Sequence, residues 1–233
     1  MKRRVGTLLA AAAAFLVPAM ARAHISVASG PGFANTTQEI VFGVGHGCEG
    51  ADTYSVKIEI PAGVTSVRPE RSDFGKVSVE KNAAGDVIAI SWQKADGDLL
   101  ASDFGYYKLA VRLKLPNQPF TILYFPTHQT CKASDGTLST THWIGTPANA
   151  GGAEPPEPAP ALQVVPARKA GWNKFTVPAA VPDLSLYLGD ALIVWKGTAA
   201  YSSNPATAEL AKTTSGVSEL TALQAGDEIW VRY

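Results

Sequence analysis

The stretch TYSVKIEIPAGV, residues 53–64, alternates polar and apolar side chains along its first eight positions. A period of two is typical of a strand that buries one face against a core and leaves the other face in water. The segment ends at Pro61 and Gly63, residue types that end strands and form turns. We therefore predict a half-buried strand here, whose inward side chains are Tyr54, Val56, Ile58 and Ile60.

The same alternation recurs on the C-terminal side of this strand. The stretch YYKLAVRLKLP, residues 106–116, follows it, and KVSVEKNAAGDVIAISWQK, residues 76–94, has the pattern of a hairpin with a polar loop. Up to about residue 145, no segment has the period of a strong amphipathic helix. Short strands joined by turns predict an all-β fold, an immunoglobulin-like antiparallel β-sandwich.

Composition divides the rest of the chain. We expect the sandwich over residues 24–147 and a semi-extended linker over residues 148–168, which are rich in Pro, Ala and Gly. Residues 169–233 predict a small β-rich C-terminal module, with a short helix that Asn204 caps. We expect the tryptophans of this module to be core residues; they are Trp172, Trp195 and Trp230.

Residues 1–23 have the three parts of a secretory signal peptide. Three basic residues precede a run rich in Leu and Ala, which ends in the small-x-small cleavage motif Ala21-Arg22-Ala23. The run is shorter than the about 20 apolar residues that span a bilayer, and no later segment is long enough. We expect export to the periplasm, removal of the leader, and no membrane span in the mature protein.

Cleavage after Ala23 makes His24 the first residue of the mature chain. A free α-amine has a pKa of about 8, so it readily exchanges its proton for a metal ion, and imidazole is a good copper ligand. One residue then offers both nitrogens in a chelate ring that suits Cu(II). Both methionines lie in the leader, which excludes Cu(I) sites built from thioether ligands.

Two cysteines, Cys48 and Cys131, remain in the mature chain. In an oxidising compartment we expect them to form a disulfide; the alternative, a thiolate metal site, lacks any CxxC spacing. His46 lies two residues before Cys48 and His128 three residues before Cys131, so the disulfide would bring two histidines to neighbouring loops. His142 is expected to point away from Trp143 and to be solvated.

The formal net charge is zero and only 17% of residues are charged, so nucleic acid is not an expected partner. There is no GxSxG nucleophile motif, which argues against a serine hydrolase. The carboxylates that could complete a metal site are not selected by any spacing; they are Glu49, Asp52 and Asp103.

Several segments together resemble the YcnI-like family, also known as domain of unknown function 1775. They are HISVASG (24–30), VGHGCEGADTYSVKIEIPAGV (44–64), SWQK (91–94), DFGYYKLAVRLKLP (103–116), YFPTHQTC (124–131) and HWIG (142–145). The resemblance implies an exported β-sandwich that holds Cu(II) in a histidine brace at the processed N-terminus, beside a tryptophan. By position, these residues are His24 and Trp143. Many members carry a carboxylate in the turn that here reads Gly45-His46-Gly47, and we expect His46 to replace it.

We therefore predict a periplasmic Cu(II)-binding protein without enzymatic activity, acting as a copper chaperone or buffer. Its candidate metal residues are His24, His46, Trp143 and His128, and its expected partners are copper, other periplasmic copper chaperones and copper transporters. One alternative is a histidine-brace copper oxygenase that acts on polysaccharide, with the C-terminal module binding the glycan. Another is an interaction sandwich that binds no metal.

Overall fold

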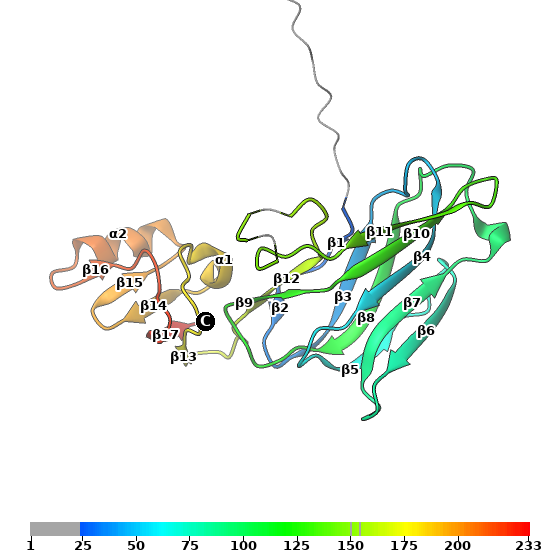
Figure 1. The fold of residues 1–233 in the computed structure, drawn as a ribbon. Helices are drawn as coiled ribbons and strands as arrows, with labels where there is room; N and C mark the ends of the chain where they lie inside the picture. Colours follow the sequence, from blue (N-terminus) through cyan, green and yellow to red (C-terminus); the bar gives the residue numbers. More distant parts are fainter. Residues whose placement is uncertain (1–23, 150, 154) are drawn as a thin grey trace, which may run out of the picture.

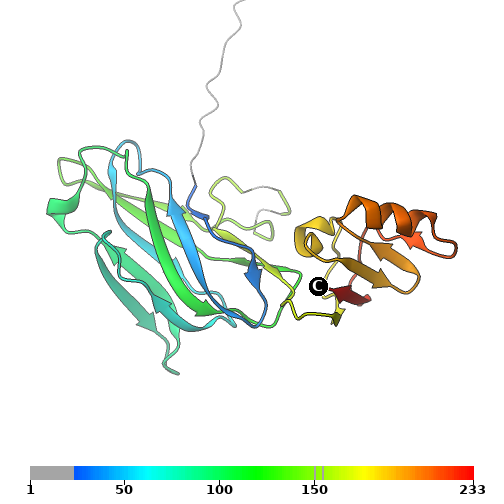
Figure 2. The same cartoon turned by 180° about the vertical axis from the view of Figure 1, so that it is seen from behind.

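The computed structural model describes residues 24–149, 151–153 and 155–233. The predicted signal peptide, residues 1–23, lies outside the described residues. Figures 1 and 2 show a large β-sandwich and a smaller module beyond the end of the sandwich that carries β9 and β12. In the described part of the chain, no helix is both long enough and apolar enough to cross a membrane.

Two facing sheets form the sandwich. The first has the order β1-β3-β8-β5, with β1 (Ser26–Val27), β3 (Thr37–Val44), β8 (Tyr107–Lys114) and β5 (Thr65–Pro69). The second has the order β11-β10-β4-β7-β6, with β11 (Leu138–Trp143), β10 (Thr127–Lys132), β4 (Asp52–Glu59), β7 (Val87–Gln93) and β6 (Lys76–Lys81). Neighbouring strands within both sheets are antiparallel. A short 3₁₀ helix, η1 (Asp96–Asp98), follows β7.

The core of the sandwich lies between these two sheets. Ile58 of β4, which was predicted to point inward, and Leu109 of β8 are fully buried and belong to one apolar cluster. Phe42 of β3 and Phe125 meet edge-to-face in this cluster, with ring centroids 5.2 Å apart. Such burial is the main favourable term in folding. Tyr54 departs from the prediction, because it is only half-buried.

A third sheet closes one end of the sandwich. It has the order β2-β12-β9, with β2 (Gly32–Phe33), β12 (Ala161–Val165) and β9 (Thr121–Tyr124). Leu162 and Val164 of β12 are buried in the core of the sandwich. The linker predicted over residues 148–168 is therefore wrong over Ala161–Val165. The high Pro and Ala content of the region hid a short apolar run that completes a sheet.

The C-terminal module is β-rich, as predicted. Its sheet has the order β13-β17-β14-β15-β16, with β13 (Trp172–Thr176), β17 (Glu228–Arg232), β14 (Ile193–Lys196), β15 (Ala199–Tyr201) and β16 (Ser218–Glu219). The helices are α1 (Ser185–Leu188) and α2 (Pro205–Thr213). Asn204 caps α2 as expected, because its side chain accepts hydrogen bonds from the backbone N–H groups of Ala206 and Thr207.

The core prediction for the tryptophans of this module is wrong. Trp172 and Trp230 are about half exposed, and Trp195 is half-buried. In β17 the side chains of Ile229 and Val231 point inward, so Trp230 between them must point to the outer face. The alternation of the strand decides the side, and it outweighs the usual preference of tryptophan for burial.

The sandwich and the module are joined through Phe120, which lies just before β9. Its backbone N–H donates to Val164 of β12 at 2.9 Å, but its side chain is buried in the core of the module. Its ring lies 6.1 Å from that of Phe175 and 5.7 Å from that of Tyr187. One aromatic side chain of the sandwich therefore belongs to the second core.

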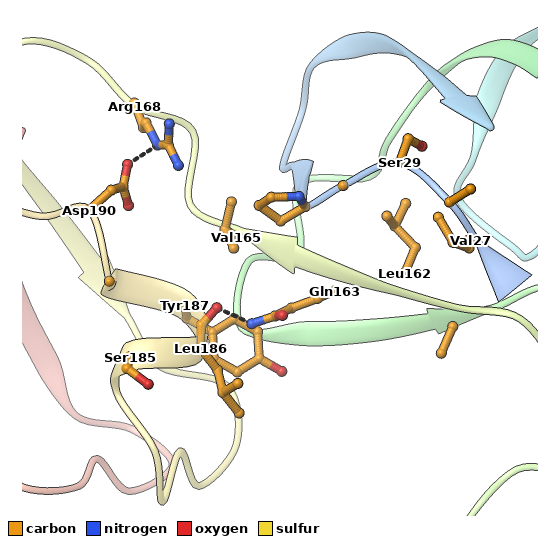
Figure 3. Close-up of a pocket in the computed structure, with 15 residues that line it drawn as sticks. Val27, Ser29, Leu162, Gln163, Val165, Arg168, Ser185, Leu186, Tyr187 and Asp190 are labelled. Atoms are coloured by element: carbon orange, nitrogen blue, oxygen red, sulfur yellow. Dashed lines mark hydrogen bonds and ion pairs between the residues drawn. The ribbon is translucent and has the colours of Figure 1, made fainter.

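A cavity of about 540 Å³ lies beside this junction, between the segment after β1, strand β12 and helix α1 (Figure 3). Two links cross it. The side-chain amide of Gln163 donates to the carbonyl of Leu186, and Arg168 forms an ion pair with Asp190. The charged groups of Arg168 and Asp190, which line the cavity, are already paired with each other. We therefore interpret the cavity as part of the contact between sandwich and module.

Candidate functional site

The first described residue, His24, is held in place by its neighbours. Ile25 is buried in the core of the sandwich, and β1 pairs with β3 through Ser26 and Gly43. The half-buried imidazole of His24 meets the indole of Trp143 edge-on, with ring centroids 5.3 Å apart and an interplanar angle of 87°. Two of the four predicted metal residues are therefore in contact.

Trp143 is fixed by a buried hydrogen bond. Its indole is 5% exposed, and its Nε1–H donates to Oε1 of Gln129 at 3.0 Å. Indole has no other polar atom, so its hydrogen-bonding capacity is used completely. Trp143 thus forms a rigid wall beside His24 and supplies no donor atom.

Gln129, in β10, connects Trp143 to the turn that carries His46. Its Nε2 donates to the backbone carbonyl of His46 at 2.6 Å and to Oγ1 of Thr53 at 2.8 Å. Gln129 is 1% exposed, so these partners replace water for a buried amide. The sequence analysis did not select Gln129. The signal that would have found it is its position two residues before an inward-pointing cysteine.

The glycines around His46 permit a tight turn. A Cβ atom at Gly47 would lie 1.7 Å from the carbonyl oxygen of Ala51, so only glycine fits there. Cys48 and Ala51 exchange two backbone hydrogen bonds of 3.0 and 2.9 Å around Glu49 and Gly50, which both have positive φ. The imidazole of His46 turns back on this loop, with Nδ1 against the carbonyl of Gly47.

The predicted disulfide is confirmed. Cys48 and Cys131 are bonded, with Cα atoms 5.7 Å apart and a sequence separation of 83. A loop of this length stabilises the fold by about 4 kcal/mol in the chain-entropy model. The bond ties the His46 turn to β10, two residues from Gln129.

His128 lies away from the other three predicted metal residues. Along β10 the side chains of Thr127, Gln129 and Cys131 are buried, and those between them are partly exposed. His128 therefore points to the outer face of the sheet, whereas Gln129 points inward to Trp143. On the outer face it meets His142, which is exposed as predicted.

The three candidate carboxylates have separate positions. Asp52 is 1% exposed and bonded to Lys94 and Tyr107, so it is not free to bind a metal. Glu49 is exposed on the turn, and the Cβ atom of Asp103 lies beside Gly47. Within residues 24–149, 151–153 and 155–233, no three His, Cys, Asp or Glu side chains form a group that could hold a metal ion.

Replacing Gln129 by Leu should lower the free energy of unfolding by about 1–3 kcal/mol, because it leaves the indole N–H of Trp143 and the carbonyl of His46 buried without their partner. Urea unfolding measures this change. The control is Gln93→Leu on the exposed face of β7, which should change stability by no more than about 0.5 kcal/mol. Equal stabilities of the two variants would contradict the role given to Gln129.

Comparison with known proteins identifies the sandwich. The model of the domain of unknown function DUF1775 matches residues 24–164, well over half of the chain. A search of curated proteins finds no match.

One solved structure is similar at the level of the fold. A crystal structure of an uncharacterized protein from Nocardia farcinica, described as revealing an immunoglobulin-like fold, is 25% identical, with a TM-score of 0.51. The match covers 62% of this chain and 99% of that chain. A cohesin–dockerin complex from Clostridium thermocellum is 12% identical with a TM-score of 0.36, over 61% of this chain and 99% of that chain. This likeness is too weak to support any inference about this chain.

The predicted all-β, immunoglobulin-like class is confirmed, and the family match ends inside β12, in agreement with the place of that strand in the sandwich. Over residues 24–164 the chain belongs to the DUF1775 family, the YcnI-like family.

Proposed function

We propose that the protein is exported, is cleaved after Ala23, and then binds Cu(II) as cargo through the α-amine and imidazole of His24. The observation that carries this proposal is the placement of His24 by Ile25 and β1, with its ring against the buried indole of Trp143. A residue whose position is fixed before the metal arrives binds it with less loss of entropy.

The donor set fits Cu(II). A primary amine and an imidazole on one residue are nitrogen ligands that suit the tetragonal field of this ion. The α-amine is a backbone group, so a site of this kind requires no cluster of three metal-binding side chains. We assign the third ligand to His46, whose turn shares the amide of Gln129 with Trp143. To bind copper, the His46 imidazole must rotate away from the carbonyl of Gly47.

Exposure at this edge of the sandwich favours a carrier. His24 and His46 are both half-buried, so an acceptor protein can reach a bound ion and exchange ligands with it. We propose that the protein is a copper chaperone or buffer of the periplasm, and that it passes Cu(II) to other copper chaperones or transporters.

The test is the intact mass and the metal content of the protein purified from the periplasm. We expect a mature chain that begins at His24, retains copper, and passes it to a copper-binding acceptor. A chain that begins at any other residue would overturn the proposal. With copper and a reductant, release of oxidised sugars from chitin or cellulose would instead identify an oxygenase, the alternative that the exposed Trp172 and Trp230 favour.

A further inference from the structure

His128 and His142 form a pair on the outer face of the β11-β10-β4-β7-β6 sheet. They are direct partners in the register of β10 and β11, and their Nδ1 atoms lie 2.7 Å apart. The ring centroids are 5.0 Å apart, with an interplanar angle of 75°. Two nitrogens at this distance share a single proton, so one ring donates and the other accepts.

Glu59 decides which ring accepts. At the end of β4, its Oε1 lies 2.9 Å from Nε2 of His128. A carboxylate accepts hydrogen bonds, so the proton of neutral His128 belongs on Nε2, and Nδ1 of His128 keeps a free lone pair. Nδ1 of His142 then donates to it. A carboxylate behind a histidine is the usual arrangement for fixing a metal-binding tautomer.

We propose that this pair is a second metal site, which binds a divalent cation with a preference for imidazole through Nδ1 of His128 and Nδ1 of His142. With metal–nitrogen bonds of about 2.0–2.1 Å, two ligands at a right angle have nitrogens about 2.9 Å apart. The pair is already within a few tenths of an ångström of that spacing. The proton of His142 moves to Nε2, and water completes the coordination. Cu(II) should bind more tightly than Zn(II).

The charges around the pair permit a cation. Lys57 of β4 is the register partner of His128, and its ammonium is paired with Glu80 at 2.7 Å. Glu59 adds a negative charge next to His128. Both imidazoles reach solvent, so an ion can enter without any rearrangement of the sheet.

This site is independent of the proposed brace. His142 and Trp143 are neighbours on β11 and point to opposite faces of the sheet, so the two sites lie back to back. Failure of one does not imply failure of the other. The fully loaded protein would therefore bind two ions.

The experiment uses the exported protein with His24→Ala and His46→Ala, which removes both imidazoles of the proposed brace and leaves the outer pair. Calorimetric titration with Cu(II) and with Zn(II) should give about one ion per chain. His142→Ala on this background should weaken binding at least about 10-fold, and Glu59→Gln should weaken it about 10-fold or more.

Thr140→Ala on the same background is the matched control, because Thr140 is exposed on β11 two positions from His142, and it should leave the affinity unchanged. In NMR spectra, the Nδ1 resonances of both His128 and His142 should move on addition of Zn(II). The proposal is overturned if His142→Ala on this background binds both metals as tightly as the His24→Ala/His46→Ala parent. His142→Ala and Glu59→Gln change exposed side chains, so both variants should keep the circular dichroism spectrum of the parent.

Discussion

His24→Ala is expected to weaken Cu(II) binding at the brace by about 100-fold or more, which is about 2.7 kcal/mol. The substitution keeps the α-amine but removes the imidazole, so the chelate ring is lost. Competition against a chromophoric copper chelator measures the change.

The measurement needs a background in which the outer pair, His128 and His142, cannot bind copper. We would use His128→Ala/His142→Ala for both the parent and the His24→Ala chain. On this background His46→Ala, which removes the proposed third ligand and keeps the amine and imidazole of His24, should produce a smaller loss. If the His24→Ala chain binds Cu(II) as tightly as its parent, copper is held elsewhere and the brace assignment is wrong.

Asp52→Asn is expected to lower the free energy of unfolding at pH 7 by about 3–5 kcal/mol, because it leaves a buried ammonium without its counter-charge. Lys94 is 5% exposed, and its Nζ donates to Oδ2 of Asp52 at 2.6 Å. The phenol of Tyr107 donates to Oδ1 at 2.6 Å, and the backbone N–H of Leu100 donates to Oδ2 at 2.9 Å. Urea unfolding measures the loss.

The matched control is the exposed pair Lys57–Glu80, where Glu80→Gln should cost no more than about 1 kcal/mol. A second variant, Asp52→Leu/Lys94→Met, removes both charges and should recover much of the stability. If Asp52→Asn lowers the free energy of unfolding by no more than Glu80→Gln does, the buried Asp52–Lys94 pair is not a major contributor to stability.

The same network makes the stability of the protein depend on pH in the acid range. Burial alone would raise the pKa of Asp52, but hydrogen bonds from Lys94, Tyr107 and the amide of Leu100 outweigh burial and hold its pKa below the usual value. A carboxylate with a lowered folded-state pKa stabilises the protein above its unfolded-state pKa of about 4, and this stabilisation is lost as the pH falls through the folded-state value. The difference in stability between parent and Asp52→Asn should therefore shrink below about pH 4.

The sequence predicted the sandwich because alternation is a local property. The inward positions of β8 and most of those in β4 follow directly from the period of two, and the disulfide followed from two cysteines in an exported chain. Alternation could also have placed His128: it lies three residues from Cys131, so the two side chains point to opposite faces. The same reasoning applied to β17 would have placed Trp230 outside.

Other features depend on contacts that no local pattern contains. The pairing of His128 with His142 needs the register of β10 against β11, and the approach of Lys94 to Asp52 joins residues 42 positions apart. β12 was missed because it is a strand of only five residues inside a Pro-rich region. It is recognised as a strand only through its pairing with β2 and β9, which the local sequence does not reveal. Export, copper and the brace stay predictions.

The position of Phe120 bears on how the protein can be divided. A shortened chain that stops after β12 would still contain the whole region matched by the family model, but the ring of Phe120 would lose its surroundings and face water. A bare aromatic ring at a strand edge invites self-association. Expression of the sandwich alone should therefore be tried with a polar residue at position 120, since the native fragment is expected to be poorly soluble for a reason unrelated to metal binding.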